Sequence, residues 1–455
     1  MCNRMFFAIL CLLVSLGWSL PVSAAADDWY TEGEFTPVVR IKLTLVNQLD
    51  IDREQCPVIV RRNMMPITNF MAPNLVVVDP LLPGQTGEEK KPPPGVYVRS
   101  APKETNGHHL RFQVDDIDQD GIWDELFFMT DIKANESKTI YVYLSSYAAR
   151  SRSGSFPHET HAEVGRYGRH YVPWWESKPM GWKLWFFDSV DMYGKRIPKL
   201  VANHENTLNL SGHSHPRDYG NDILWVSDTF GASAICLIEE PGNVENVSRP
   251  RFSPTKDKGP LYDTRFAHHV IANGPLRSII RTDLMNWRTG KGEYELQKHY
   301  TAYAGKNYST CKVRYTKFLP DDNDIEFGVG MRKIMSEYKS YQQGGIIISN
   351  GKNMDLWDIN KTLKEGEKYI VSWEAIALVV KDEYKPRCQA IKAYGGNYLM
   401  RIPVTEELSY EFMMIGGWSE GYVNSSEQQF RDYVIKTARE YNSPIKVTGF
   451  TVERK

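Results

Sequence analysis

The sequence predicts a mostly β protein whose strands pair antiparallel. Residues 38–46 alternate apolar and polar side chains, and residues 139–144 and 276–282 are rich in β-branched and aromatic side chains. Glycine, proline, asparagine and aspartate interrupt these runs at intervals that are typical of turns. Because few segments have helical spacing, we expect only a few helices, at the margins of the sheets.

One helix is predicted together with its start. Ser425 is a candidate N-cap, and Gln428, three residues on, is its capping-box partner. Phe430 and Val434 then begin an apolar series at helical spacing, which Pro444 ends. We also expect a shorter helix over residues 331–342 and a final strand over residues 445–452.

The chain divides into three parts. Residues 1–26 join a basic start, a nearly unbroken apolar run and small residues before a cleavage point, which is typical of an export signal. Residues 146–158, rich in serine, arginine and glycine, predict a linker. We therefore expect a β-sandwich-like domain over residues 28–150, a larger β domain over residues 151–455, and a periplasmic or secreted protein.

Composition argues against several partners. The 55 basic and 56 acidic side chains nearly cancel, so no overall field attracts nucleic acid. No further apolar segment is long enough for membrane insertion. The spacing of Cys56, Cys236, Cys311 and Cys388 fits no zinc motif, so we expect buried thiols with at most one disulfide.

An acidic segment over residues 116–125 resembles a calcium-binding loop. Asp116, Asp118, Asp120 and Asp124 could direct carboxylate oxygens toward one cation, and Gly121 allows the sharp turn. The glutamate that ends an EF-hand loop is missing. The alternative is an Asp- and Gly-rich hairpin turn. We expect at most a structural Ca²⁺ here and no cofactor that the chemistry requires.

Tryptophans and histidines gather between residues 167 and 222. Trp174, Trp175 and Trp182 offer flat faces of the kind that stack on sugar rings. The alternative is that these aromatic side chains build an ordinary β core. Composition alone does not decide whether the tryptophans form a sugar-binding surface or part of a hydrophobic core.

A polar loop follows the tryptophans. His213 and His215 lie two residues apart, and Tyr219 and Asp222 follow, so one loop carries a base, an acid and a carboxylate. A metal site that also uses His204 is a rival interpretation, and a polar surface loop is another.

A strand predicted over residues 295–303 would direct Lys298 to one face and His299 to the other. Either side chain could reach a substrate in a cleft, and we count both as candidate substrate-binding residues. The alternative is a half-exposed strand without a functional role.

A series of short motifs follows in a fixed order along the chain: Phe112-Gln-Val-Asp-Asp116, Asp120-Gly-Ile-Trp-Asp-Glu-Leu-Phe127, Lys138-Thr139, Trp175-Glu-Ser177, Asp191-Met-Tyr-Gly-Lys-Arg196, Gly220-Asn-Asp222, Asn273-Gly-Pro-Leu-Arg277, Tyr303-Ala-Gly305, Phe327-Gly-Val-Gly330 and Gly416-Gly-Trp418. Their order resembles the exported Bacteroidetes family catalogued as domain of unknown function 4861. The resemblance covers nearly the whole chain after residue 26.

That family is similar to the oligosaccharide dehydratase of ulvan degradation and to enzymes with a galactose-mutarotase-like β-supersandwich. The resemblance implies removal of water from the uronic acid at the non-reducing end of an acidic oligosaccharide, which gives a 4,5-unsaturated uronate. A polysaccharide lyase that acts by β-elimination and an acidic-glycan-binding protein without catalysis are the alternatives. By motif match, the resemblance carries over Glu176, Asp222 and Arg277, and either His213 or His215.

Such a reaction needs a base for the C5 proton, an acid for the departing hydroxyl and a cation that neutralises the carboxylate. We expect His213 or His215 as the base, with His299 in reserve, Tyr219 as the acid and Arg277 as the cation. Glu176 or Asp222 would orient the histidine. Trp174, Trp175 and Trp182 would stack on the sugar.

Overall fold

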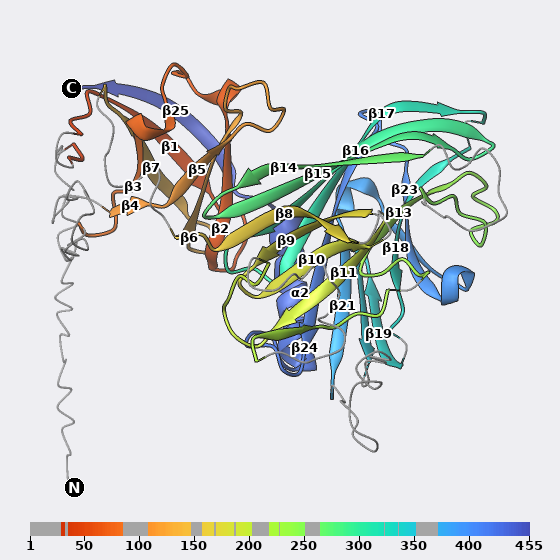
Figure 1. The fold of residues 1–455 in the computed structure, drawn as a ribbon. Coiled ribbons are helices and arrows are strands. Elements are labelled where there is room, and N and C mark those ends of the chain that lie inside the picture. Colours follow the sequence, from red (N-terminus) through yellow and green to blue (C-terminus); the bar gives the residue numbers. More distant parts are fainter. Residues whose placement is uncertain are drawn as a thin grey trace, which may run out of the picture.

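The structure is a computed structural model that describes residues 29–31, 35–84, 108–146, 157–167, 170–185, 188–202, 218–226, 228–250, 264–322, 324–334, 336–351 and 372–455. The described chain forms two units built from antiparallel sheets (Figure 1). This confirms the predicted fold class. The expected export signal over residues 1–26 lies outside the described residues.

The first unit is a sandwich of two sheets with the strand orders β25-β1-β7-β3-β4 and β2-β6-β5. Its strands are β1 (Val39–Val46), β2 (Arg53–Arg61), β3 (Leu75–Asp79), β4 (His108–Leu110), β5 (Phe112–Asp115), β6 (Glu125–Ile132), β7 (Ser137–Leu144) and β25 (Lys446–Arg454). Ile41, Leu43 and Leu45 alternate along β1 and pack against Val58 and Phe128 of the opposite sheet. The period of two places one face of each strand in this core.

The last strand of the chain completes the first unit, which differs from the predicted domain boundaries. Strand β25 was expected as a strand, and its existence is confirmed, but the domain over residues 151–455 was expected to keep it. Instead it pairs antiparallel with β1, from Val39 opposite Arg454 to Val46 opposite Lys446 (Figure 1, blue beside red). Pairing partners so distant in sequence leave no local signal, so the sequence pattern could not assign this strand to its sheet.

The second unit holds three sheets with the strand orders β12-β11-β10-β9-β8, β13-β18-β23-β22 and β14-β15-β16-β17-β24-β21-β20-β19. Its strands are β8 (Thr160–Tyr167), β9 (His170–Ser177), β10 (Met180–Trp185), β11 (Ser189–Lys195), β12 (Gly220–Asp222), β13 (Ala234–Ile238), β14 (Arg265–Asn273), β15 (Arg277–Arg288), β16 (Gly292–Tyr303), β17 (Tyr308–Pro320), β18 (Glu326–Arg332), β19 (Glu337–Gln343), β20 (Ile346–Gly351), β21 (Glu374–Val380), β22 (Arg387–Ile391), β23 (Asn397–Pro403) and β24 (Ser409–Trp418).

The main core lies between the eight-stranded sheet and the two smaller sheets of this unit. The Trp175 ring stacks on Tyr300 with centroids 4.6 Å apart, which joins the five-stranded sheet to the eight-stranded one. The Phe327 ring from the four-stranded sheet stacks on both Tyr315 and Tyr410. Aromatic pairs at these distances stabilise beyond the area they bury, so stacked rings fasten both smaller sheets to the large one.

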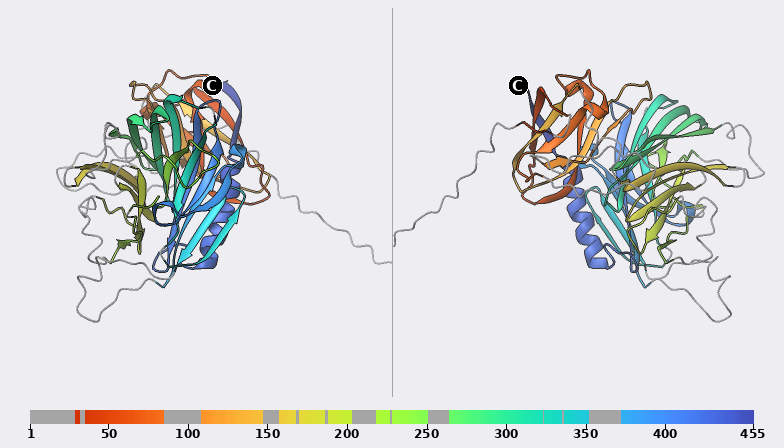
Figure 2. Two further views of the ribbon diagram at one scale, coloured as in Figure 1. Left: turned by 90° about the vertical axis from the view of Figure 1, so that its right-hand side faces the viewer. Right: turned by 60° about the vertical axis from the view of Figure 1, so that its left-hand side comes forward.

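The helix α2 (Glu427–Asn442) covers the outer face of β20 and β21 with Phe430, Val434 and Ala438 (Figure 2). The predicted helix is therefore confirmed. Its cap is one residue later than predicted, because the Ser426 side chain accepts the N–H of Gln429. Short 3-10 helices lie at η1 (Arg62–Met64), η2 (Ala72–Asn74), η6 (Asp382–Tyr384) and η7 (Ala393–Gly395).

The helix expected over residues 331–342 is wrong. This segment contains the end of β18 and most of β19, which pair with β23 and β20. Pairing with distant strands here outweighs local propensity. The four cysteines of the described chain are free thiols; Cys56, Cys236 and Cys311 are buried, as expected, whereas Cys388 is only partly buried. Within the described residues, the helices are too short or too polar to cross a membrane.

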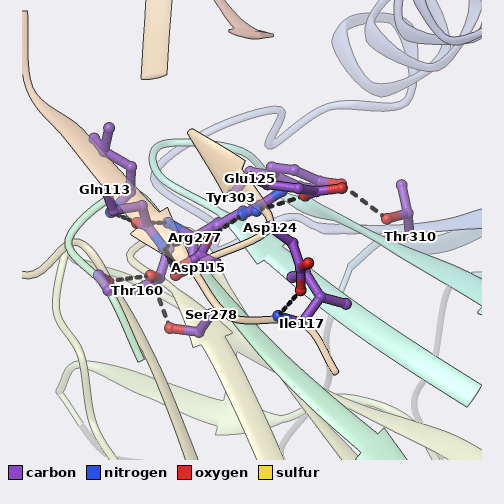
Figure 3. A network of polar contacts seen from close by, with 12 residues as sticks. Gln113, Asp115, Ile117, Asp124, Glu125, Thr160, Arg277, Ser278, Tyr303 and Thr310 are labelled. Atoms are coloured by element: carbon purple, nitrogen blue, oxygen red, sulfur yellow. Dashed lines mark hydrogen bonds and ion pairs between the residues drawn. The ribbon is translucent and has the colours of Figure 1, made fainter. Parts of the chain in front are cut away.

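Arg277 joins the two units (Figure 3). Its Nε lies 2.6 Å from a carboxylate oxygen of Asp115, and its Nη2 lies 2.7 Å from one of Glu125. The side-chain oxygen of Gln113 accepts the N–H groups of Leu276 and Arg277, both at 2.9 Å. Burial opposes the charge of Arg277, but the two carboxylates raise its pKa above the usual value, so the guanidinium stays charged.

The placement of Arg277 differs from the expected role as a cation that holds the substrate carboxylate. Only 3% of its side chain is exposed, and both carboxylate partners belong to the protein. A guanidinium that is already engaged by Asp115 and Glu125 does not offer its charge to a ligand. Arg277 therefore serves the junction between the units.

We expect Arg277→Met to lower the free energy of unfolding by about 3–5 kcal/mol, because it leaves the Asp115 carboxylate buried without its cation. Chemical denaturation monitored by tryptophan fluorescence measures this loss. The double variant Arg277→Met/Asp115→Asn should lose less than the sum of the two single variants. Additive losses would show that the two side chains do not act as a pair.

Candidate active site on the five-stranded sheet

The three tryptophans that were expected to stack on sugar lie in the interior. Trp174, Trp175 and Trp182 are each 0% exposed. Trp175 and Trp182 point into the main core, while Trp174 points to the opposite, outer face of the sheet and packs with Tyr193. A ring without exposed surface cannot stack on a ligand, so the alternative of an ordinary β core holds for these residues.

The outer face of the five-stranded sheet carries charged side chains that are almost fully buried. Because side chains alternate along a strand, those that share a face with Trp174 can be identified from the strand register. They are Glu176 on β9, Lys183 on β10, Asp191 and Lys195 on β11, and Asp222 on β12. We call this set the buried charged face. Ionisable groups are rarely buried without a specific need.

Lys183 lies between two carboxylates. Its Nζ is 3.1 Å from Asp191 and 2.7 Å from Asp222. Burial, followed by the negative charge of Asp222, raises the pKa of Asp191 to about 7, although Lys183 partly opposes this. Burial alone would lower the pKa of Lys183, but the two carboxylates raise it above its usual value. Asp191 can therefore gain or lose a proton near neutral pH beside a permanently charged ammonium.

Glu176 and Lys195 form a second buried pair. The Glu176 carboxylate also accepts the backbone N–H groups of Val201 and Ala202, at 3.0 and 2.9 Å. Lys195 donates to the carbonyl oxygen of Lys199 at 2.8 Å. Burial lowers the pKa of Lys195, and Glu176 opposes the shift. This pair fixes the chain just before residue 203.

The chain just after residue 217 is fixed to the same strand. The backbone N–H of Arg196 donates to the carbonyl oxygen of Tyr219 at 2.8 Å, and the guanidinium donates to that of Gly220 at 3.2 Å. The described residues on both sides of residues 203–217 thus lie beside the end of β11. His204, His213 and His215 lie in this segment, outside the described residues, and their roles stay a prediction.

Tyr219 and Lys199 lie together at this place. Tyr219 is half-buried and packs with Trp174, Val201 and Ala202. The Lys199 ammonium lies 5.0 Å from the centroid of the Tyr219 ring, within range of a cation–π interaction. A phenol and a cation therefore lie beside the two ends of the segment over residues 203–217, which we call the histidine segment. Sequence reasoning found Tyr219 and missed Lys199.

Asn221 and Glu374 add polar groups without hydrogen-bond partners. Both Asn221 side-chain atoms and one Glu374 oxygen are buried without a partner among the described residues. Burial raises the pKa of Glu374 well above its usual value, Arg332 opposes the shift, and Asp222 adds to it. Buried polar atoms are almost always hydrogen-bonded, so these exceptions are candidate positions for a bound water or a ligand.

Lys298 and His299 point to opposite faces of β16, as predicted, and so they do not share a site. Lys298 is fully buried in the core, with its ammonium 5.5 Å from the centroid of Tyr300, and burial lowers its pKa to about 8. His299 lies on the outer face of the eight-stranded sheet, away from the buried charged face. Burial, with help from Arg281 and Lys312, lowers its pKa to about 4.

The acidic loop brings together three of its four predicted ligands. One carboxylate oxygen from each of Asp116, Asp118 and Asp120 lies within 4.8 Å of the others. Asp124 has a different role, because its carboxylate accepts the N–H of Ile117 at 2.7 Å and so holds the turn. Three hard oxygen donors, from the exposed Asp118 and Asp120 and the half-buried Asp116, suit Ca²⁺, which also retains water ligands.

A cavity of about 390 Å³ lies between the two units, beside the Arg277 network. Gln113, Asp115, His158 and Asn273 are among its lining residues. It lies apart from the buried charged face, and most of its lining residues belong to two of the sequence motifs, over residues 112–116 and 273–277.

We expect millimolar Ca²⁺ to raise the melting temperature and EDTA to reverse the rise, because an ion that binds only the folded state stabilises it. The effect should be absent in Asp118→Ala and present in Asp321→Ala, an exposed control outside the loop. Mg²⁺ should act more weakly. Equal responses of both variants to Ca²⁺ would contradict a site at Asp116, Asp118 and Asp120.

Asp191 should make the stability depend on pH. Between about pH 4 and about pH 7 the folded protein keeps a proton on Asp191 that the unfolded chain releases. The contribution of Asp191 to the free energy of unfolding therefore falls as the pH rises toward and through 7. Asp191→Asn cannot release a proton. The free energy of unfolding of the unmodified protein, relative to this variant, should fall by roughly 1–3 kcal/mol from about pH 5 to about pH 8. Urea titrations at each pH measure this free energy difference, and the exposed Glu407→Gln is the control variant. A difference between the unmodified protein and Asp191→Asn that does not change with pH would refute the raised pKa of Asp191.

Comparisons with known proteins place the chain in a family. No curated protein matches it. Among solved structures it is similar to an alpha-mannosidase from Enterococcus faecalis V583, with 9% identity, a TM-score of 0.46, and coverage of 91% of this chain and 46% of that one. A glycosyl hydrolase family 38 protein from Enterococcus faecalis gives 9% identity, a TM-score of 0.45 and coverage of 90% and 47%. This chain thus spans about half the length of either protein.

The model of the family described as Domain of unknown function (DUF4861) matches residues 100–447. That match includes the motifs in the second unit and the acidic loop of the first. The family predicted from the order of the motifs is thereby confirmed: the chain belongs to the DUF4861 family.

Proposed function

We propose that this protein is a carbohydrate-active lyase that removes water from a uronic acid at the non-reducing end of an acidic oligosaccharide. The observation that carries the proposal is the anchoring of both ends of the segment over residues 203–217 beside the buried charged face. The resemblance of the family to the ulvan oligosaccharide dehydratase supplies the reaction. The buried charged face supplies groups that suit it.

The elimination moves two protons and breaks one C–O bond. A base takes the proton from C5, the electron pair forms the C4–C5 double bond, and the hydroxyl on C4 leaves as water after an acid protonates it. A cation must stabilise the negative charge that develops on the uronate carboxylate. The products are a 4,5-unsaturated uronate and one water molecule.

Described residues take two of these three roles in a revised assignment. His213 or His215 remains the proposed base. Tyr219 is the proposed acid, and Lys199, beside the Tyr219 ring, takes the role of the carboxylate-binding cation. Lys199 is half-exposed and, unlike Arg277, forms no ion pair with a carboxylate of the described residues.

Asp191, Lys183 and Asp222 lie on the same face of the sheet as Trp174, against which Tyr219 packs, and they supply a titrating carboxyl group there. Asp191 exchanges its proton near neutral pH, and Lys183 holds the two carboxylates in place. The proposed role of Glu176 also changes. It does not orient a histidine ring by itself; with Lys195 it holds the backbone at Val201 and Ala202, from which the histidine segment departs.

Incubation with saturated uronic-acid-ended oligosaccharides should give a product that is lighter by one water in mass spectrometry and that absorbs as a conjugated enol ether. Loss of the base or the acid should lower turnover by ~10²–10⁴-fold. His213→Ala, His215→Ala and Tyr219→Phe test these roles, and the exposed His158→Ala is the control.

Undiminished turnover in both His213→Ala and His215→Ala would refute the assignment of the base. Cleavage of the glycan chain in place of the loss of water would favour the polysaccharide lyase alternative. Binding without any change of the oligosaccharide would favour a binding protein.

A further inference from the structure

The outer face of the eight-stranded sheet carries a row of basic and imidazole side chains. His269 on β14 pairs with Arg281 on β15, Arg281 with His299 on β16, and His299 with Lys312 on β17. Paired residues point to the same face, and neighbouring strands lie about 4.8 Å apart. Arg314 lies two residues beyond Lys312 on the same face. We call these five side chains the cationic row.

The helix α2 covers this outer face over β20 and β21 but not the cationic row. Lys312 and Arg314 are exposed, and neither forms an ion pair with another residue of the described chain. His269 and Arg281 both contact Asp283, each at 3.2 Å. One carboxylate thus faces three permanent cations, which leaves a local positive excess in a protein whose overall charge is −1.

The row ends in a carboxylate that another cation already holds. Lys312 pairs in register with Glu411 on β24, and the Lys381 ammonium lies 3.5 Å from that carboxylate. His299 stays uncharged at neutral pH because its pKa is lowered to about 4 by burial and by Arg281 and Lys312. An uncharged imidazole can both donate and accept hydrogen bonds.

We propose that the cationic row binds a stretch of an acidic glycan chain, at a site separate from the buried charged face. Lys312 and Arg314 would contact carboxylate or sulfate groups, and Asp283 with the His299 imidazole would contact hydroxyl groups. The row crosses four strands, which suits an extended polymer better than a single small anion. The main core lies between this surface and the buried charged face.

The choice of a glycan over other polyanions rests on the proposed function, so the experiment measures binding and turnover separately. Isothermal titration with polygalacturonate should give an affinity that falls as salt rises. Lys312→Gln/Arg314→Gln should weaken binding by roughly five- to tenfold, since two exposed charge contacts are lost. The same variant should keep most of its turnover of short saturated uronic-acid-ended oligosaccharides.

The matched control is Lys446→Gln/Arg454→Gln, which removes the same charge from two exposed residues at the ends of β25. This variant should bind polygalacturonate as the unmodified protein does, and neutral dextran should bind to none of them. Equal weakening in both double variants, or unchanged binding in Lys312→Gln/Arg314→Gln, would overturn the proposal. Binding of double-stranded DNA as tight as that of polygalacturonate would overturn it too, because the row would then recognise charge alone.

Discussion

The structure depends on the rule that a charge withdrawn from water must meet an opposite charge. Removing an ion from water costs several kcal/mol, and only close partners with good geometry offset that cost. Lys183 meets Asp191 and Asp222, Glu176 meets Lys195, and Arg277 meets Asp115 and Glu125. Each group tolerates little displacement. These contacts therefore set the register of β9 to β12 and the way in which the two units meet, beyond what apolar packing requires.

The same rule links architecture to chemistry on the five-stranded sheet. Its inner face is apolar and joins the main core through Trp175 and Trp182. Its outer face keeps charges, and there the backbone on both sides of the histidine segment is tied down. A loop that carries catalytic groups needs both of its ends fixed to a rigid sheet, because small displacements of reacting groups cost much of the rate. The proposed role of the histidine segment agrees with this arrangement.

Much of the fold was predictable from the sequence, and much of the site was not. The alternation in β1 and the apolar series of α2 are local patterns, and both appeared where they were expected. The error at residues 331–342 arose because β18 and β19 are set by distant partners. Asp191 and Lys195 stood inside a recognised motif, yet no spacing rule shows that they face Asp222 and Glu176. Trp174, Trp175 and Trp182 were assigned to sugar binding because composition does not reveal exposure.

The return of β25 to the first unit has a consequence for how the chain is made. Strand β25, which covers the edge of the sheet at β1, is synthesised only after the whole second unit. Until then β1 lacks one neighbour, and its exposed backbone N–H and C=O groups invite wrong partners. The N-terminal unit therefore cannot mature first in the order of synthesis. Its final assembly must wait for the larger unit.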